Sequence, residues 1–335
     1  GVVIQLKADL NREGEKLPTD FSPYQNIRRV LPGAALTVCS AGRNIHIEPR
    51  PALNYEPQSF FENETLAKSA LGDALRKSAS EFLPTQDTWG SFLSGGIDSS
   101  MATALIHRTN PKIAAFTLGT EFGDEFQDAG DLAKSLNITQ DRVLTDAASA
   151  RAHFERAVFC NEAWDGLTVE TLAQLSLLAT AAAPRVKHIV TGYGSDLLFG
   201  SMLSHELYMK LTGVRDLQSL IERTCWTAEF SPFFAWSLGV TVHHLFWHPE
   251  VMNQAFRIPS AMNVAGSKDK MVLRNLACEQ GYLQQHQAFR KKQALTDGTQ
   301  FNRLLSLALG LEGNYAYSDK GRIATSFLKG ISHVR

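Results

Sequence analysis

The segment Ser94-Gly95-Gly96-Ile97-Asp98-Ser99 has the composition of a loop that binds phosphate groups. It follows a short apolar run and precedes a stretch with the apolar spacing of a helix. Adjacent glycines let the backbone approach an anion closely, while the first amides of the helix and the serine hydroxyls donate hydrogen bonds to it. Asp98 would then coordinate Mg²⁺ rather than contact phosphate. The alternative is a glycine turn with a Ser/Asp helix cap, but the order strand, glycines, acidic residue and helix favours phosphate binding.

The elements around this loop alternate between strand and helix. Periodicity and turn residues predict, in order, a helix over Glu64–Phe82, a strand over Trp89–Leu93, a helix over Ser99–His107, a strand over Ile113–Leu118, a helix over Phe126–Leu136, a helical stretch over Ala147–Ala183 and a strand over His188–Val190. This alternation predicts an α/β fold with a doubly wound parallel sheet, whose ligands bind beyond the carboxyl ends of the strands. Residues after about 200 look mainly helical, and residues 1–60 read as a proline-rich appendage of short strands and turns.

Composition favours a small-molecule substrate. The 335 residues are 44% hydrophobic and carry 33 basic against 34 acidic side chains, so no net field attracts nucleic acid or an anionic membrane. Four cysteines without CxxC spacing argue against a zinc site and a disulfide framework. With no apolar run long enough to span a membrane and no signal-peptide pattern after Gly1, we expect a cytoplasmic protein. A homo-oligomer remains open.

The glycine-rich loop resembles the SGGxDS loop of the asparagine-synthetase superfamily of ATP pyrophosphatases. A second block, Val190 to Gly200, is similar to the other active-site loop of that superfamily. Tyr193 in this block stands where ordinary asparagine synthetases have an acidic residue and where β-lactam and carbapenam synthetases have tyrosine. The resemblance is closest to carbapenam synthetase and covers most of residues 60–310. It implies an ATP-pyrophosphatase fold of the adenine nucleotide alpha hydrolase-like type over 61–335, with 1–60 as an appendage or the remnant of a glutaminase-like domain.

The resemblance also implies catalytic roles. Tyr193 and Glu229 match a dyad that removes a proton from the attacking amine, and Lys292, six residues before Gly298, matches a lysine that stabilises the oxyanion. Taken alone, Glu229 is more often a solvated or ion-paired residue. Between Lys292 and Gly298, the residues Ala294, Thr296 and Asp297 depart from the β-lactam pattern, and the Thr-Asp-Gly ending is more like asparagine synthetase.

The resemblance assigns Mg²⁺ to Asp98 and Asp196, which are hard oxygen ligands of the kind this ion prefers. By itself, Asp196 could equally cap a helix running from Leu197 to Leu203. Lys270, before a helix predicted over Met271–Glu279, matches a lysine that contacts phosphate, although it could also be a solvated helix start. The expected nucleotide-binding residues are Leu93, Ser94, Gly95, Gly96, Asp98, Ser99, Leu118, Gly192 and Lys270. We expect His243, His244 and His248 to be structural rather than metal ligands.

These residues predict adenylation of a substrate carboxylate by MgATP, followed by attack of an amine in the same molecule to close a lactam and release AMP. Such an enzyme would act in the biosynthesis of a β-lactam natural product. An ammonia-dependent amide ligase of the asparagine-synthetase type shares the first half-reaction, and a lasso-type peptide macrocyclase would adenylate a carboxylate within a peptide. A catalytically inactive nucleotide-binding subunit is the alternative outside the enzymes.

Overall fold

The computed structural model describes residues 59–81, 87–201, 233–291 and 295–332, together with 22, 24–28, 30, 36–41 and 44–49. In the N-terminal part, β1 (Leu36–Ala41) and β2 (Asn44–Pro49) form an antiparallel hairpin, with Leu36 opposite Pro49 and Ala41 opposite Asn44. Short strands and turns were predicted for this part of the chain, and the described residues agree with that.

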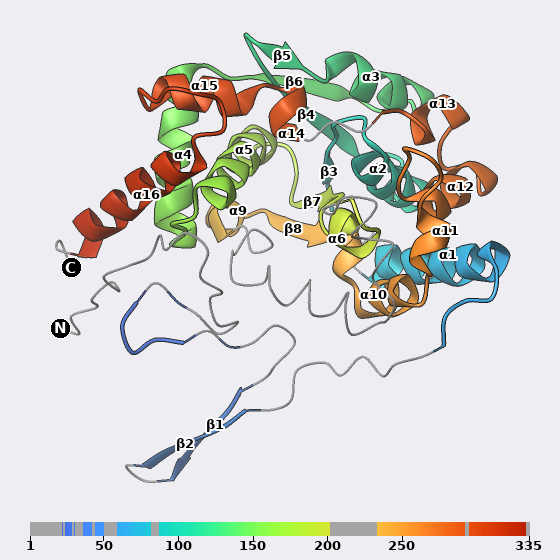
Figure 1. Cartoon of the computed structure of the whole chain (residues 1–335), viewed down its shortest axis with the longest axis horizontal. Helices are drawn as coiled ribbons and strands as arrows, with labels where there is room; N and C mark the ends of the chain where they lie inside the picture. The colour runs from blue at the N-terminus through green and yellow to red at the C-terminus, as the bar shows by residue number, and fades with distance from the viewer. Residues whose placement is uncertain are drawn as a thin grey trace.

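A parallel sheet lies at the centre of the molecule (Figure 1). Its parallel strands lie in the spatial order β6-β4-β3-β7-β8, and their bounds are β3 (Trp89–Phe92), β4 (Ala114–Thr120), β6 (Gln140–Leu144), β7 (His188–Thr191) and β8 (Thr241–His244). A two-residue strand, β5 (Gly123–Asp124), pairs antiparallel with the end of β4. The chain builds outward from β3 through β4 to β6 and then returns to β7. The strand order therefore reverses between β3 and β7, the position at which doubly wound sheets bind ligands.

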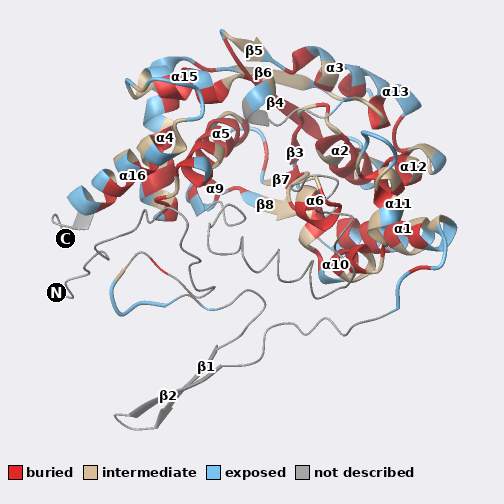
Figure 2. Ribbon diagram, in the orientation of Figure 1, coloured by how far each residue is buried: buried red, intermediate tan, exposed pale blue. Residues whose placement is uncertain are grey.

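Two layers of helices cover the two faces of the sheet. One core cluster contains buried side chains from α1 (Glu64–Glu81), α2 (Ile97–Thr109), α3 (Phe126–Ser135), α10 (Pro249–Phe256) and α12 (Met271–Glu279). The other contains side chains from α4 (Ala147–Asn161), α5 (Gly166–Ala182), α9 (Phe233–Ser237), α15 (Phe301–Ala308) and α16 (Tyr317–Ser332). Figure 2 shows these buried residues between the helices and the strands. The predicted α/β fold with a parallel sheet is confirmed.

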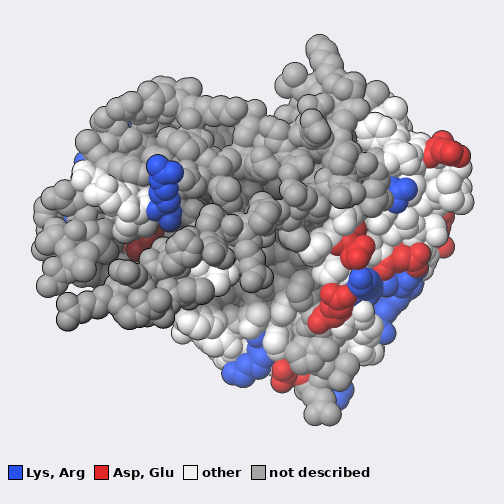
Figure 3. Space-filling model, turned by 90° about the horizontal axis from the view of Figure 1, so that it is seen from below, with Lys and Arg blue, Asp and Glu red and all other residues white. Residues whose placement is uncertain are grey.

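Short helices complete the part of the chain that the structure describes. They are α6 (Ser195–Leu198), the 3₁₀ turn η2 (Leu245–Trp247), α11 (Ser260–Asn263), α13 (Gln285–Ala288) and α14 (Leu295–Gly298). None of the described helices combines the length and the apolar composition needed to cross a bilayer. On the face shown in Figure 3, the basic and acidic side chains of the described residues are interspersed.

The structure adds three details to the predicted elements. The helical stretch over Ala147–Ala183 is two helices, because Glu162 adopts a left-handed conformation with φ 51° and Asp165 caps α5 by accepting a hydrogen bond from the Thr168 N–H. Strand β6 was not predicted, since its side chains are largely polar and half-exposed at an edge of the sheet. Strand β8 interrupts the region expected to be mainly helical.

Candidate active site

The two loops singled out in the sequence meet at the point where the strand order reverses. The first follows β3 and leads into α2, and the second follows β7 and leads into α6. Gly192 of the second loop packs directly on the first, since a Cβ at this position would lie 2.5 Å from the Asp98 carbonyl carbon and from the Ser99 nitrogen. Only glycine allows the two loops to approach so closely. The sheet thus brings together two segments that lie about a hundred residues apart.

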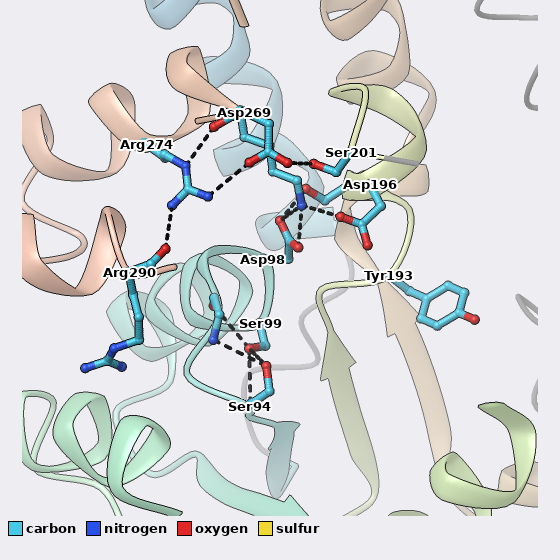
Figure 4. A network of polar contacts seen from close by, with 12 residues as sticks. Ser94, Asp98, Ser99, Tyr193, Asp196, Ser201, Asp269, Arg274 and Arg290 are labelled. Atoms are coloured by element: carbon cyan, nitrogen blue, oxygen red, sulfur yellow. Dashed lines mark hydrogen bonds and ion pairs between the residues drawn. The ribbon is translucent and has the colours of Figure 1, made fainter. Parts of the chain in front are cut away.

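The first loop has the internal structure expected of a phosphate-binding loop. The Ser94 N–H donates to Ser99 Oγ at 3.2 Å, the two serine hydroxyls lie 3.0 Å apart, and the Gly96 N–H faces Ser94 Oγ at 3.3 Å (Figure 4). Gly95 has φ 80°, and a Cβ there would lie 2.7 Å from Asp128. Gly96 is the N-cap of α2 and supplies no side-chain cap, so the Ser/Asp cap considered from sequence is not formed. An anion can therefore take the place of a cap at this helix start.

The Lys270 ammonium lies between the two carboxylates predicted to bind Mg²⁺. Its Nζ is 2.6 and 2.5 Å from the two oxygens of Asp98 and 2.5 Å from Asp196 Oδ1. The Lys270 side chain has no exposed surface, whereas the Asp98 and Asp196 side chains are 20% and 37% exposed. Burial disfavours the charged ammonium, but attraction to the two aspartates outweighs burial and raises the pKa of Lys270 above its ordinary value. Lys270 is thus a buried, charged residue rather than the solvated helix start considered from sequence.

The donor set suits a magnesium ion that also binds phosphate. Oxygens of Asp98 and Asp196 converge on one cationic group, so both carboxylates can face a single cation. Mg²⁺ is typically held by one or two carboxylates together with substrate phosphates, rather than by a full protein cage. The described residues contain no group of three or more His, Cys, Asp or Glu side chains that could hold a metal.

The second loop supports the first. Ser195 is buried, and its hydroxyl donates to Asp98 Oδ1 at 2.5 Å, which orients that carboxylate. Gly194 has φ 95°, and a Cβ there would lie 2.7 Å from Trp247 Nε1. The N-cap of α6 is Gly194, so the cap role considered for Asp196 is wrong. Because α6 ends at Leu198, the helix considered from Leu197 to Leu203 is also wrong within the described residues.

Tyr193 is half-buried and packs against the core cluster that contains α4 and α5. Its N–H faces Thr191 Oγ1 at 3.3 Å, and its ring lies 5.6 Å from the ring of His244, which itself contacts Thr191 Oγ1 at 2.6 Å. In Figure 4 the Tyr193 side chain points away from Asp98 and Asp196. Its predicted partner, Glu229, lies outside the described residues, so the dyad remains a prediction.

Lys292 also lies outside the described residues, as do Ala294 and the side chain of Thr296. The chain on either side of Lys292 is described and is considered below. Leu93 and Leu118 have buried side chains, and Leu93 N–H donates to the Phe116 carbonyl at 3.0 Å.

Each of the three histidines contacts other side chains of the protein. His243 lies 3.0 Å from His188 Nδ1 and packs against the ring of Trp89 at 4.9 Å. Burial, together with His188, lowers the pKa of His243 to about 4. His248 caps α10, and its Nε2 lies 2.7 Å from Glu81 Oε2.

Several polar residues that support the site were not singled out in the sequence. Asp269 accepts a hydrogen bond from Ser201 at the end of the second loop and contacts Arg274 Nη2 at 3.1 Å. Arg274 is 3% exposed and also donates to the carbonyls of Asp269, Ala288 and Arg290. Asp269 and Arg274 are charged and close to Lys270 in the sequence. No periodicity in the sequence indicated that their partners lie in other loops.

Glu125 was also not identified from the sequence as part of a site. Its side chain is 8% exposed, and its Oε2 has no hydrogen-bond partner among the described residues. Burial, and to a lesser extent Asp128 and Asp124, raises the pKa of Glu125 to about 8. The carboxyl packs against Gly298, where a Cβ would lie 2.7 Å from Glu125 Oε1. The Glu125 carboxyl thus packs against Gly298, six residues after Lys292.

Comparison with known proteins agrees with this site. A family model described as asparagine synthase matches residues 70–223. Carboxyethyl-arginine beta-lactam-synthase of Streptomyces clavuligerus is 28% identical over 210 residues, which is 62% of this chain and 40% of that protein. Asparagine synthetase [glutamine-hydrolyzing] 1 of Lotus japonicus is 25% identical over 275 residues, which is 74% of this chain and 46% of that protein. The chain therefore spans less than half the length of either relative.

Among solved structures, NMN synthetase from Francisella tularensis matches 79% of this chain and 93% of its own, with a TM-score of 0.37 and 14% identity. The sequence matches cover both loops of the site, since residues 70–223 include Ser94–Ser99 and Val190–Gly200. A family model described as asparagine synthase thus matches the part of the chain that holds both loops, and the chain is similar over part of its length to asparagine synthetases and to a carboxyethyl-arginine β-lactam synthase.

Proposed function

We propose that this protein is an ATP-dependent carbon–nitrogen ligase that adenylates a substrate carboxylate and then closes a lactam with an amine of the same molecule. The observation that carries the ligase proposal is the convergence of Asp98, Asp196 and Lys270 beside a glycine-rich helix start. This arrangement offers anionic ligands for a metal, a buried cation for phosphate and free helix amides at one point. The asparagine synthase match supports the same reaction class.

In the first half-reaction, a carboxylate oxygen of the substrate attacks the α-phosphorus of ATP. The bond to the bridging oxygen breaks, so that acyl-AMP forms and pyrophosphate leaves. Mg²⁺ held by Asp98 and Asp196 would neutralise charge on the phosphate oxygens. The protein contributes the amides and hydroxyls of the first loop and the ammonium of Lys270, which must move from its aspartate partners toward the phosphates to bind them.

In the second half-reaction, the amine attacks the acyl carbon, the carbon–oxygen bond to AMP breaks, and the amine loses a proton. We assign the proton to the Tyr193 and Glu229 dyad, and the stabilisation of the oxyanion to Lys292. Holding the amine against the acyl carbon supplies the proximity needed to close a strained ring. Tyr193 supports this finer assignment because it lies on the loop that also carries Asp196 and matches the tyrosine of the β-lactam-forming enzymes.

The substrate that we propose is a small amino-carboxylic acid, and the product a β-lactam natural product or its precursor. Because ATP is a co-substrate and the cysteines lack paired spacing, we place the enzyme in the cytoplasm. An ammonia-dependent amide ligase is the second candidate. Two observations favour the amide ligase: the ending Thr296-Asp297-Gly298 and the match to the Lotus japonicus asparagine synthetase. Tyr193 favours ring closure.

Mass spectrometry of the products tests the proposal. The protein is offered MgATP with a panel of β-amino acids and other amino-carboxylic acids, with and without ammonia. Loss of one water from a single substrate identifies a cyclase, whereas incorporation of ammonia identifies an amide ligase. Release of neither pyrophosphate nor AMP with any acid would contradict the ligase proposal itself.

A double-mutant cycle tests the dyad. We expect Tyr193→Phe and Glu229→Gln each to block lactam formation while isotope exchange between pyrophosphate and ATP continues, because adenylation does not need the base. The double variant should lose little more than the worse single variant, since removing one partner disables the unit. Cyclisation by Tyr193→Phe at the parental rate across pH would mean that the phenol is not the base.

A further inference from the structure

Arg290 lies two residues before Lys292 and contacts the phosphate-binding loop. Its Nη1 faces the carbonyl of Gly95 at 3.5 Å and donates to the carbonyl of Asp128 at 2.9 Å. Its Nε lies 3.3 Å from Asp128 Oδ1, and its Nη2 lies 3.0 Å from Asp131 Oδ2. Each of the three guanidinium nitrogens thus faces a protein oxygen, and the side chain is 18% exposed. Arg290 is therefore committed to protein contacts rather than to a ligand.

The backbone of Arg290 is held from the opposite side. Arg274 donates to the carbonyl of Ala288 and lies 3.4 Å from that of Arg290, while it also binds Asp269, next to Lys270 (Figure 4). Asp269 in turn accepts the hydroxyl of Ser201, which follows the second loop. A continuous set of polar contacts therefore runs from the second loop through Asp269, Arg274 and Arg290 to the first loop.

The far end of the same segment rests on the sheet. Gly298 lies against Glu125, and its carbonyl would be 2.8 Å from a Cβ at Gly123, so this end is packed tightly on β5 and the start of α3. The Thr120 hydroxyl donates to the next carbonyl, that of Thr299, at 2.6 Å. Asp297 accepts a hydrogen bond from the Tyr315 hydroxyl at 2.9 Å. Arg290 and Gly298 therefore both contact α3 or its N-cap residue Glu125, and Asp128 of α3 also packs against Gly95 of the phosphate-binding loop.

We infer that Arg290 is a positioning residue for Lys292, because it holds the chain against the phosphate-binding loop two residues before that lysine. This inference rests on the role proposed for Lys292. A guanidinium reaches Gly95, Asp128 and Asp131 at once because its donors form a rigid fork, whereas a lysine ammonium is a point charge. Misplacement of a catalytic group by about 1 Å can reduce turnover about a hundredfold, so loss of this anchor should affect chemistry far more than nucleotide binding.

The test compares Arg290→Met and Arg290→Lys with the parent and with Arg322→Met. Arg322 is 70% exposed and pairs only with a residue of its own helix in the described contacts, so it is a matched control for loss of a guanidinium. Hydrogen exchange is measured for peptides covering residues 93–100, 285–300 and, as a reference for the core, 166–182. Binding of α,β-methylene-ATP and substrate-dependent release of AMP are measured for the same proteins.

We expect Arg290→Met to exchange about tenfold faster over 285–300 with no change over 166–182. Its affinity for the ATP analogue should fall by less than about threefold while AMP release falls about ten- to a hundredfold. Arg290→Lys should behave like Arg290→Met, since the fork is lost, and Arg322→Met should resemble the parent. Full rescue by lysine would overturn the inference in favour of simple charge compensation of Asp128 and Asp131.

Unchanged exchange over 285–300 in both Arg290 variants would also overturn the inference. Failure of the proposed function is distinguishable from this result. If the parent forms no adenylate with any acid of the panel, the ligase proposal fails, while the exchange experiment still decides whether Arg290 anchors the segment. If Arg290→Met does not fold, Arg290→Lys carries the same comparison, because it keeps the charge and the length of the side chain.

Discussion

Replacing Lys270 by methionine should destabilise the ligand-free protein and at the same time strengthen its binding of Mg²⁺. Methionine keeps an unbranched chain of similar length and removes the ammonium alone. In the parent, that ammonium lies 2.5 Å from an oxygen of Asp98 and 2.5 Å from one of Asp196, and it has no exposed surface. Its removal leaves two carboxylates facing each other without the cation that holds them together.

The magnitude follows from the burial of the three groups. Removing one partner of a fully buried ion pair costs about 3–5 kcal/mol. Here the Asp98 and Asp196 side chains retain 20% and 37% exposure, so water solvates them in part. We therefore expect the free energy of unfolding to fall by about 2–3 kcal/mol in the absence of divalent ions.

The affinity for Mg²⁺ should rise in Lys270→Met, whereas the free energy of unfolding falls. A metal ion that binds both carboxylates of the parent must first displace the ammonium, whereas in Lys270→Met there is no ammonium to displace. Since a factor of ten in affinity corresponds to about 1.4 kcal/mol, a displacement cost of about 2 kcal/mol predicts Mg²⁺ binding roughly thirtyfold tighter in the variant when no nucleotide is present. Excess MgCl₂ should therefore restore part of the lost stability.

Urea unfolding in EDTA and in excess MgCl₂ measures the stability, and calorimetric titration with MgCl₂ measures the affinity. Lys112→Met is the control, because Lys112 is exposed in the turn after α2 and should change neither quantity. The reasoning is refuted if Lys270→Met is as stable as the parent in EDTA and both proteins gain equally from Mg²⁺. Such a result would mean that the ammonium does not hold the two aspartates together.

Three further outcomes follow from the site. Asp98→Asn and Asp196→Asn should each nearly abolish substrate-dependent pyrophosphate release, because each removes an anionic oxygen ligand; normal release in both would remove the metal assignment. Lys292→Ala should leave the affinity for a non-hydrolysable ATP analogue within several-fold and reduce product formation about a hundredfold, since an oxyanion donor acts mainly in the transition state. Glu125, with its pKa raised to about 8, is protonated in the folded protein and ionised in the unfolded chain between its ordinary pKa and about 8. Stability should therefore fall as pH rises through this window, by at most about 1.4 kcal/mol per pH unit, and urea unfolding should show no such slope in Glu125→Gln.

The sequence predicted those parts of the fold and site that depend on neighbouring residues. A buried strand, two glycines, an acidic residue and a helix follow one another within Trp89–Thr109, and the structure confirms each of them. The helix after Lys270 was predicted with its observed bounds, Met271–Glu279. Apolar periodicity and turn residues act over a few positions, so they can be read without knowledge of the rest of the chain.

The details that the sequence did not predict arise where tertiary contacts outweigh local preference. Strand β6 has largely polar side chains and forms because β4 offers it a backbone partner from Ala115 to Gly119. Strand β8 pairs in register with β7, with Thr191 beside His244, and this pairing defines one edge of the sheet. Phe233 and Trp236 of α9 are large and apolar, yet they are 55% and 79% exposed. A residue's type does not say which face of its element will be covered.

The sequence by itself therefore determined which side chains could do the chemistry, because an SGGxDS loop, a second aspartate and a lysine at a helix start are local signals. Only the tertiary structure decided that Lys270 lies between Asp98 and Asp196, which are 172 and 74 residues away from it. It likewise decided that Arg290 reaches the carbonyl of Gly95, 195 residues earlier. The physical reason is the reversal of strand order between β3 and β7, which brings distant loops to one point where charges attract at short range with little water between them.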